Sequence, residues 1–455
     1  MGQTSSNWMP VGIATVFHFL VDGLCLCCLY LMAEDCQSAT GLLPLFLTYN
    51  ILAFMTQPLT GWWVDRLHKA TSDSPLKGKA SKALFLAIGL LTSAVVLLAG
   101  ADALDSQASS TSQTCLSLLV AILLGMGNSL FHVWGGKLTA SLTGNDMRAL
   151  GVFVSTGVVG LTVGMVYASW WLMAGMLLLI IILSPAPYLL SLLGGTSTRQ
   201  PSLQGYSPKW GRWLLLLVLA FVLLRSFVGE VIPTGLEKTP NVLLLLALTA
   251  MMGKAIGGWV ARWWGIGSGI VACVGIAAAC LMWREADSIP LLPIAIGVFA
   301  INCTMPMTLH LANRLLPWRE GLSFGLLAAV LIPGYMLAKS LDLSSDHHFM
   351  LSALLLTIAV EVGMLMLMGE KRKDVLVGAV AVNILTNVPL NYFLLTYGNS
   401  TGRLATGELL VLLVEAVWYY LFVRQWQKAA IYSLLCNATS FLFGVLLQYI
   451  IIYSF

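Results

Sequence analysis

The sequence has 455 residues, of which 58% are hydrophobic and only 10% are charged, and its formal net charge is +4. A soluble domain carries about 25% charged residues, so this composition excludes a water-facing globular protein. The small positive charge does not indicate a nucleic-acid partner, because basic residues are expected to anchor helices at one face of a membrane.

Apolar runs of about 20 residues recur along the whole chain, and each is long enough to cross a ~30 Å hydrocarbon core as a helix. Backbone amides in lipid must be paired within their own segment, so we predict an all-α polytopic protein embedded in a lipid bilayer. The break between the fifth and sixth spans, at 168–170, is the shortest. The fifteen predicted spans are 10–33, 41–63, 83–101, 114–140, 148–168, 170–194, 212–233, 241–263, 266–283, 289–315, 321–341, 348–368, 374–397, 404–423 and 429–453.

The basic residues between the spans indicate their orientation. With the N-terminus in the cytoplasm, most of them fall in inner loops, and the outer loops hold only Lys238, Arg284 and Arg403. We therefore predict a multi-pass protein of the cell membrane, specifically a bacterial inner membrane, with a cytoplasmic N-terminus.

The first span contains two ionisable residues, His18 and Asp22. They are four residues apart and so share one face of the helix. An imidazole beside a carboxylate suits a proton-coupling site, because ionisable groups inside a membrane are costly and tend to be functional. The alternative is a structural hydrogen-bonded pair that locks the first helix.

Three pairs of segments recur six spans apart. GWWVDR at 61–66 pairs with GGWVAR at 257–262, HFLVDG at 18–23 with RSFVGE at 225–230, and His132 with His310. Such internal repeats are typical of transporters built from two related bundles. We predict two six-helix halves, 1–194 and 212–370, joined by a cytoplasmic linker at 195–211 and followed by a three-helix extension at 371–455.

The segment GWWVDRLHK and the basic residues after it resemble the loop motif of the major facilitator superfamily. The resemblance implies a cytoplasmic gate formed by Gly61, Asp65 and Arg66. HFLVD in the first span, GMGNSLFHVWGGK at 125–137 and LRSFV at 224–228 are similar to the fosmidomycin-resistance branch of that superfamily, although Val133 replaces a proline. This branch implies drug efflux or metabolite transport, usually coupled to protons.

Five further ionisable residues within spans are predicted to bind substrate: His132, Arg225, Glu230, Lys254 and His310. Because most are basic, an anionic or zwitterionic substrate is favoured, and an arginine fork matches carboxylate or phosphate. For the histidines the alternative is a hydrogen bond to a backbone carbonyl. For Arg225 and Lys254 it is an interhelical ion pair with an acid such as Asp22.

Lys137 is nearer the end of its span than His132, so we expect its side chain to snorkel toward water.

The C-terminal extension carries polar residues at helical spacing. Asn383, Asn387 and Asn391 form a stripe in its first span, and Glu408 and Glu415 lie in the second. Polar glue between helices is one interpretation of this pattern. The other is a second polar path, or a docking site for a protein partner that uses Glu415.

The sequence thus predicts a secondary active transporter that moves a small molecule with protons by alternating access. Nine cysteines show no metal-ligand spacing, and no nucleophile elbow or phosphate loop is present. We therefore expect no metal, no cofactor and no enzymatic activity. The alternatives are a membrane sensor or scaffold that keeps the transporter fold and an intramembrane enzyme.

Overall fold

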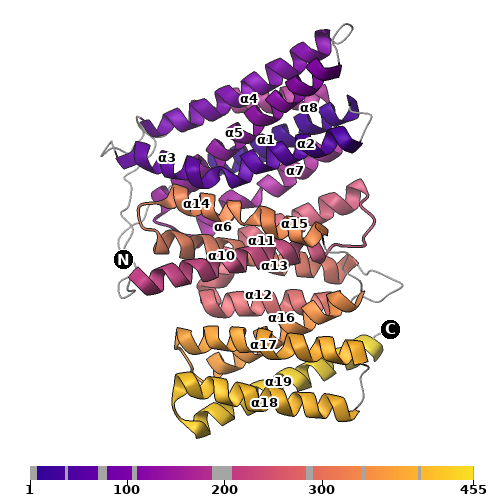
Figure 1. Cartoon of the computed structure of the whole chain (residues 1–455). Coiled ribbons are helices and arrows are strands. Elements are labelled where there is room, and N and C mark those ends of the chain that lie inside the picture. Colours follow the sequence, from indigo (N-terminus) through magenta and orange to yellow (C-terminus); the bar gives the residue numbers. More distant parts are fainter. Residues whose placement is uncertain are drawn as a thin grey trace. The chain divides into compact units, whose positions relative to one another are not determined.

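A computed structural model of the chain describes residues 8–35, 39–69, 79–104, 110–186, 208–282, 291–340, 345–397 and 401–453. Within these ranges the chain is almost entirely helical (Figure 1). Each predicted span overlaps one helix or consecutive helices, and the last part of the sixth span, 187–194, lies outside the described residues. The elements are α1 (Trp8–Asp35), α2 (Ala39–Asn50), the π-helix η1 (Ile51–Met55), α3 (Gln57–Lys69), α4 (Lys79–Leu104), α5 (Ser110–Thr143), α6 (Met147–Ser155), α7 (Gly157–Val166), α8 (Trp170–Leu183), α10 (Pro208–Val231), α11 (Pro240–Trp264), α12 (Ile266–Met282), α13 (Leu291–Leu315), α14 (Glu320–Ala329), α15 (Leu331–Ser340), α16 (Ser345–Leu367), α17 (Lys373–Tyr397), α18 (Thr401–Val423) and α19 (Trp426–Tyr453).

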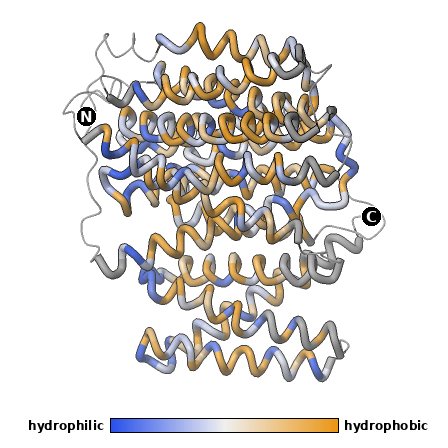
Figure 2. The backbone as a smooth tube through the Cα atoms, turned by 45° about the horizontal axis from the view of Figure 1, so that its top comes forward, coloured by the Kyte–Doolittle hydropathy of each residue, from blue (hydrophilic) through white to orange (hydrophobic). Residues whose placement is uncertain are grey.

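Hydropathy along the backbone fits a membrane protein. Among the described residues, ten helices are long and apolar enough to cross a membrane, and three further apolar helices are shorter. Hydrophobic colour dominates the middles of the helices, and hydrophilic segments gather near their ends (Figure 2). Many large apolar side chains are exposed, such as Trp171 and Leu442, as expected where lipid is the solvent.

The narrow break predicted between the fifth and sixth spans is present. α7 ends at Val166 and α8 begins at Trp170. The side chain of Ser169 accepts a hydrogen bond from the amide of Leu172 at 3.3 Å, which satisfies one of the unpaired donors at the start of α8. The break is therefore a helix cap rather than a bend in one helix.

The described residues form two compact units. Unit 1 comprises Met1–Glu230, Glu237–Val260 and Asn302–Ser340, and unit 2 comprises the remaining segments, including Leu341–Phe455. These units are defined by contacts and do not test the predicted halves, which stay a prediction. The predicted linker 195–211 lies outside the described residues up to the start of α10 at Pro208.

In unit 1, glycines bring α7 into close contact with α1. A Cβ atom on Gly160 would overlap the carbonyl oxygen of Phe19, and one on Gly164 would overlap that of Gly23. Small residues at this spacing let two membrane helices approach until their backbones touch. The contact fixes the face of α1 that carries His18 and Asp22.

In unit 2, α17 packs against α16 and α18, and α19 packs against α16 and α18. The turn between α16 and α17 is held by the carboxylate of Glu370, which bonds Arg372 and accepts from the hydroxyl of Tyr432 at 2.9 Å. Burial acts to raise the pKa of Glu370, but hydrogen bonds from Arg372 and Tyr432 outweigh it and hold the pKa at about 2. This acid is ionised and paired with cations.

Candidate functional site

Three ionisable side chains meet in unit 1. His18 Nε2 lies 3.3 Å from Asp22 Oδ2, and His132 Nε2, from α5, lies 3.5 Å from Asp22 Oδ1. His18 and Asp22 are each only 5% exposed. The sequence placed His18 and Asp22 together and assigned His132 to substrate, whereas the structure joins all three in one cluster.

Both imidazoles are oriented by backbone carbonyls. His18 Nδ1 lies 2.8 Å from the carbonyl oxygen of Phe153, and His132 Nδ1 lies 3.0 Å from that of Asn128. A carbonyl only accepts, so each Nδ1 carries a proton and donates it. The protonation state of each imidazole can therefore change only at Nε2. Both Nε2 atoms face the two oxygens of one carboxylate. The cluster can take up and release a proton there without moving its rings.

Two neighbours complete the cluster. Asn128 Nδ2 donates to Asp22 Oδ1 at 2.9 Å, which compensates part of the cost of burying this carboxylate. Gly157, the first residue of α7, has no side chain, and the cluster occupies the space beside it. A Cβ atom at this position would overlap both Asp22 Oδ2 and His18 Nε2.

We therefore predict that Gly157→Ala displaces the His18 and Asp22 side chains and sharply reduces transport. The added methyl group would overlap both side chains, and the adjacent Gly160 contact leaves α7 no room to retreat. Gly175→Ala is the matched control, because a Cβ atom there meets nothing within 4 Å. Transport rates in proteoliposomes measure the effect, and equal rates for both variants would contradict this account of the cluster.

The three donor atoms of the cluster lie within 4.8 Å of one another. Two imidazole nitrogens and one carboxylate are also a set that transition metal ions accept. The cluster is thus able to hold either protons or one such ion, and experiments on it need to separate the two.

Two cations within the predicted spans also lie in unit 1. Arg225 in α10 is 7% exposed, and its Nε has no hydrogen-bond partner among the described residues. Lys254 in α11 is half-buried, and the charged groups that act on it electrostatically are Arg225 and Asp22. Within the described part of the chain, neither cation forms an ion pair, and this includes a pair with Asp22, the acid named as the alternative partner.

A second network joins α3, α5 and α14, and we call it the Asp65 network. Lys137 Nζ lies 2.6 Å from Asp65 Oδ1 and 3.1 Å from Glu320 Oε2. Asp65 also accepts from the backbone amides of Gly321 at 3.0 Å and Leu322 at 2.9 Å, which are unpaired donors at the start of α14. These contacts bind segments 256 residues apart in the chain.

The predicted gate residues take different places around this network. Gly61 lies against α14, where a Cβ atom would overlap the carbonyl oxygen of Gly321. Asp65 is at the centre of the network. Arg66 lies outside it, with its guanidinium stacked 3.7 Å above the ring of Trp62.

Two other predicted substrate residues are not brought to the His18–Asp22–His132 cluster by any described contact. His310 Nδ1 donates to the carbonyl oxygen of Asn145 at 2.7 Å, and Asn313 Nδ2 donates to Asn145 Oδ1 at 2.9 Å. Asn145 has a φ of 62°, so these bonds hold a turn in the left-handed region. Glu230 is half-buried near the end of α10.

Sequence reasoning missed three residues of these networks. Asn128 gives no signal, because asparagine in a span is also common as packing glue. The expectation that Lys137 snorkels to water was wrong, since Lys137 is only 4% exposed and bridges two acids. Glu320 lies at the boundary of a predicted span. An acid is common there because water is close by, so the sequence does not single it out.

No protein-family model and no curated protein matches the sequence. Among solved structures, the chain is similar to a variant of the E. coli fucose:proton symporter FucP, with 13% identity, a TM-score of 0.55, and coverage of 81% of this chain and 100% of that one. It is also similar to a bacterial homologue of the iron transporter ferroportin in an outward-facing state, with 16% identity, a TM-score of 0.51, and coverage of 79% and 98%.

These likenesses, together with the apolar helices, give the chain an all-α polytopic membrane architecture of the major facilitator type, and the predicted fold class is confirmed. Both solved structures are covered almost completely. The resemblance to the fosmidomycin-resistance branch stays a prediction.

Proposed function

We propose that this chain is a secondary active transporter that moves a small anionic or zwitterionic metabolite or drug, coupled to protons, by alternating access. The observation that carries the proposal is the His18–Asp22–His132 cluster, in which two imidazole Nε2 atoms share one buried carboxylate. Ionisable groups at such depth in a membrane protein are costly and mark ion pathways.

The coupling step follows from the geometry. With one imidazole protonated at Nε2, the cluster is neutral, since Asp22 carries the opposite charge. Loss of that proton leaves a buried carboxylate with only neutral neighbours in the cluster, and this is unfavourable in a low dielectric. The cluster is therefore expected to bind a proton before the conformational change that closes it off from water. It releases the proton in the conformation that lets water in.

The α5 helix links this step to the Asp65 network. Asn128 and His132 in the cluster and Lys137 in the network belong to the same helix. A shift of α5 that follows protonation would alter the Lys137 contacts with Asp65 and Glu320, which tie α5 to α3 and α14. We propose that these contacts close one end of the transporter, in line with the gate that the sequence predicts, and that this end is cytoplasmic.

The substrate class follows from Arg225 and Lys254. Two cations inside the spans, without ion-pair partners among the described residues, attract a carboxylate or phosphate group.

We predict that Arg225→Met weakens binding of an anionic solute by about 1.5–3 kcal/mol, roughly ten- to a hundredfold, the cost of losing a charge-assisted hydrogen bond. Thermal-shift titration of the purified protein with carboxylates, phosphonates and amino acids measures it. Arg212→Met is the control, because Arg212 is exposed. Equal affinities for both variants would show that Arg225 is structural.

The same titration includes Mn²⁺ and Zn²⁺. Tight binding of either ion that disappears in His132→Asn would mean that the cluster serves a metal and not protons. If no solute and no metal binds, and the protein is purified with a stable protein partner, the alternative of a sensor or scaffold is favoured over transport.

A further inference from the structure

Two buried carboxyl groups lie between the helices of unit 2, away from the Glu370 turn. Glu361 in α16 and Glu415 in α18 are both 0% exposed. Among the described residues, neither forms an ion pair with Lys, Arg or His. Each lies within its helix rather than at an end, so both are inside the predicted spans.

The two carboxyl groups have the same hydrogen-bond pattern. One oxygen of each accepts from an asparagine amide: Asn383 Nδ2 lies 2.7 Å from Glu361 Oε2, and Asn437 Nδ2 lies 2.5 Å from Glu415 Oε2. The other oxygen faces a hydroxyl group. α17 and α19 each contribute one partner to both acids, so the two carboxyl groups form one cluster.

Each hydroxyl group that contacts a carboxyl group also has a second acceptor within reach. Thr386 Oγ1 lies 2.8 Å from the carbonyl oxygen of Val382 and 3.1 Å from Glu415 Oε1. A hydroxyl has one hydrogen, so Thr386 can donate to only one of these two oxygens at a time. When the hydrogen goes to Val382, the contact with Glu415 requires a protonated carboxyl group.

Glu361 repeats this arrangement. Ser440 Oγ lies 3.1 Å from the carbonyl oxygen of Asn437 and 3.3 Å from Glu361 Oε1. The single hydrogen of Ser440 goes to one of these two oxygens, and when it goes to the carbonyl, Glu361 supplies the hydrogen of the second contact. The surroundings of both acids thus accommodate a neutral carboxylic acid as well as a carboxylate.

A buried hydroxyl group without a hydrogen-bond partner among the described residues comes from the same helix as Glu415. Tyr419, one turn beyond Glu415 in α18, is 0% exposed, and its hydroxyl has no hydrogen-bond partner among the described residues. The groups that act on it electrostatically are Glu361, Cys436 and Glu415. A buried donor without a partner is unfavourable, and a carboxylate formed by loss of a proton would provide one.

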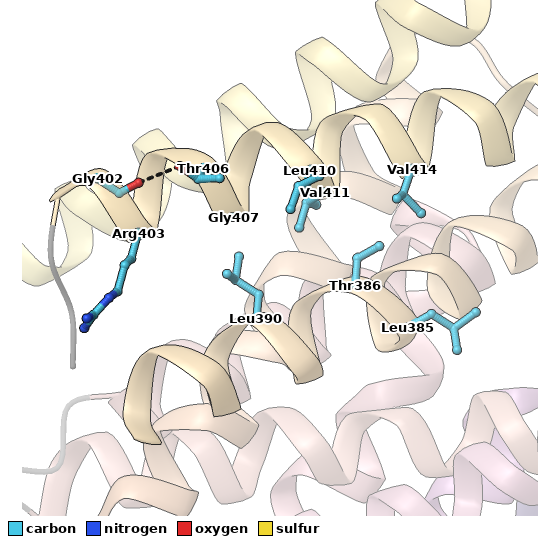
Figure 3. A pocket seen from close by; sticks show the side chains of 10 residues that line it. All are labelled: Leu385, Thr386, Leu390, Gly402, Arg403, Thr406, Gly407, Leu410, Val411 and Val414. Atoms are coloured by element: carbon cyan, nitrogen blue, oxygen red, sulfur yellow. Dashed lines mark hydrogen bonds between the residues drawn. The ribbon is translucent and has the colours of Figure 1, made fainter. Parts of the chain in front are cut away.

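A cavity in the extension borders Thr386, one of the residues of this cluster. It has a volume of about 590 Å³, lies between α17 and α18, and reaches from Gly402 and Arg403 to Thr386, the residue whose hydroxyl contacts Glu415 (Figure 3). The cavity thus extends as far as a direct contact of Glu415.

We infer that Glu361 and Glu415 form a reversible proton-binding site in the C-terminal extension, with Tyr419 as the donor that stabilises its deprotonated form. The other titratable groups near the site are Glu408 from α18 and the thiol of Cys436 from α19. The α12 helix, which packs on α16, contributes only the thiols of Cys273 and Cys280. The surrounding helices also carry the cations Lys373, Arg403 and Lys428. Among the described residues no ion pair joins any of them to Glu361 or Glu415: Lys428 Nζ lies 3.7 Å from Glu370 Oε2, and Arg403 lines the cavity.

Infrared difference spectroscopy of the full-length protein during a pH titration tests this inference. We expect carbonyl bands of protonated carboxylic acids that disappear as the pH rises, and that are partly lost in Glu361→Gln and in Glu415→Gln. Glu237→Gln, which changes an exposed residue outside these helices, leaves the bands unchanged. Tyr419→Phe preserves the shape of the core and makes the bands persist about one pH unit higher, the effect of one hydrogen bond to a charged group.

Three outcomes would overturn the inference. Spectra in which neither glutamine variant removes an acid band would show that both groups are ionised. Bands that persist at every pH at which the protein stays folded would show a fixed structural hydrogen bond. Bands replaced on addition of Na⁺ at constant pH would show a site for a metal cation.

Discussion

Asp22→Asn is expected to reduce pH-gradient-driven accumulation of solute in proteoliposomes to the level of liposomes without protein. The substitution keeps the size of the side chain and removes the charge that both His18 Nε2 and His132 Nε2 face. Without the carboxylate, a proton on either imidazole would be a buried uncompensated charge, so the cluster can no longer bind it. The solute is the one that wild-type protein selects from the carboxylate, phosphonate and amino-acid panel.

The control for this variant is solute exchange across the same membranes without a pH gradient. Exchange needs alternating access but no net proton movement, so Asp22→Asn should retain exchange. Retained exchange would also show that the variant is folded. Glu237→Gln should behave as wild type in both assays. Full gradient-driven accumulation by Asp22→Asn would contradict the coupling assignment.

Lys137→Met is expected to cause the largest loss of stability. It leaves Asp65 and Glu320, which are both 4% exposed, as buried acids without their cation. Breaking a buried ion pair by removing one partner costs about 3–5 kcal/mol. Thermal unfolding in detergent should therefore show a clear decrease in Tm.

A triple variant distinguishes this mechanism from a simple packing defect. In Lys137→Met, Asp65→Asn and Glu320→Gln combined, no charge remains buried without a partner. Neutral replacement of a whole buried ionic group costs much less than removal of one member. The triple variant should thus regain much of the lost Tm, and a further decrease would contradict the account of the Asp65 network.

The spans of this chain are predictable from the sequence because lipid imposes a length and an apolar composition on each helix. The His18–Asp22 pair is also predictable, since residues four apart share a helix face. Asp65 was found through a local motif. In each case the information lies within one turn or one span.

Contacts between distant segments were not predictable in this way. Asp65 accepts from amides that follow it by 256 and 257 positions, and no local pattern indicates such a partner. The burial of Lys137 depends on which helices surround α5. Its position near the end of a predicted span therefore gave the wrong expectation that its side chain reaches water. His310 matches His132 in the repeat, yet one histidine faces Asp22 and the other holds the turn at Asn145. Equivalent positions in a repeat therefore need not share an environment.

Proton movement driven by solute tests the central claim most directly. Wild-type protein in liposomes that enclose a pH-sensitive dye is exposed to each member of the panel, with no gradient imposed. We predict that at least one anionic or zwitterionic solute changes the internal pH, and that the same solute leaves it unchanged in Asp22→Asn liposomes. A solute that crosses the membrane through the wild-type protein with no change in internal pH would contradict proton-coupled transport.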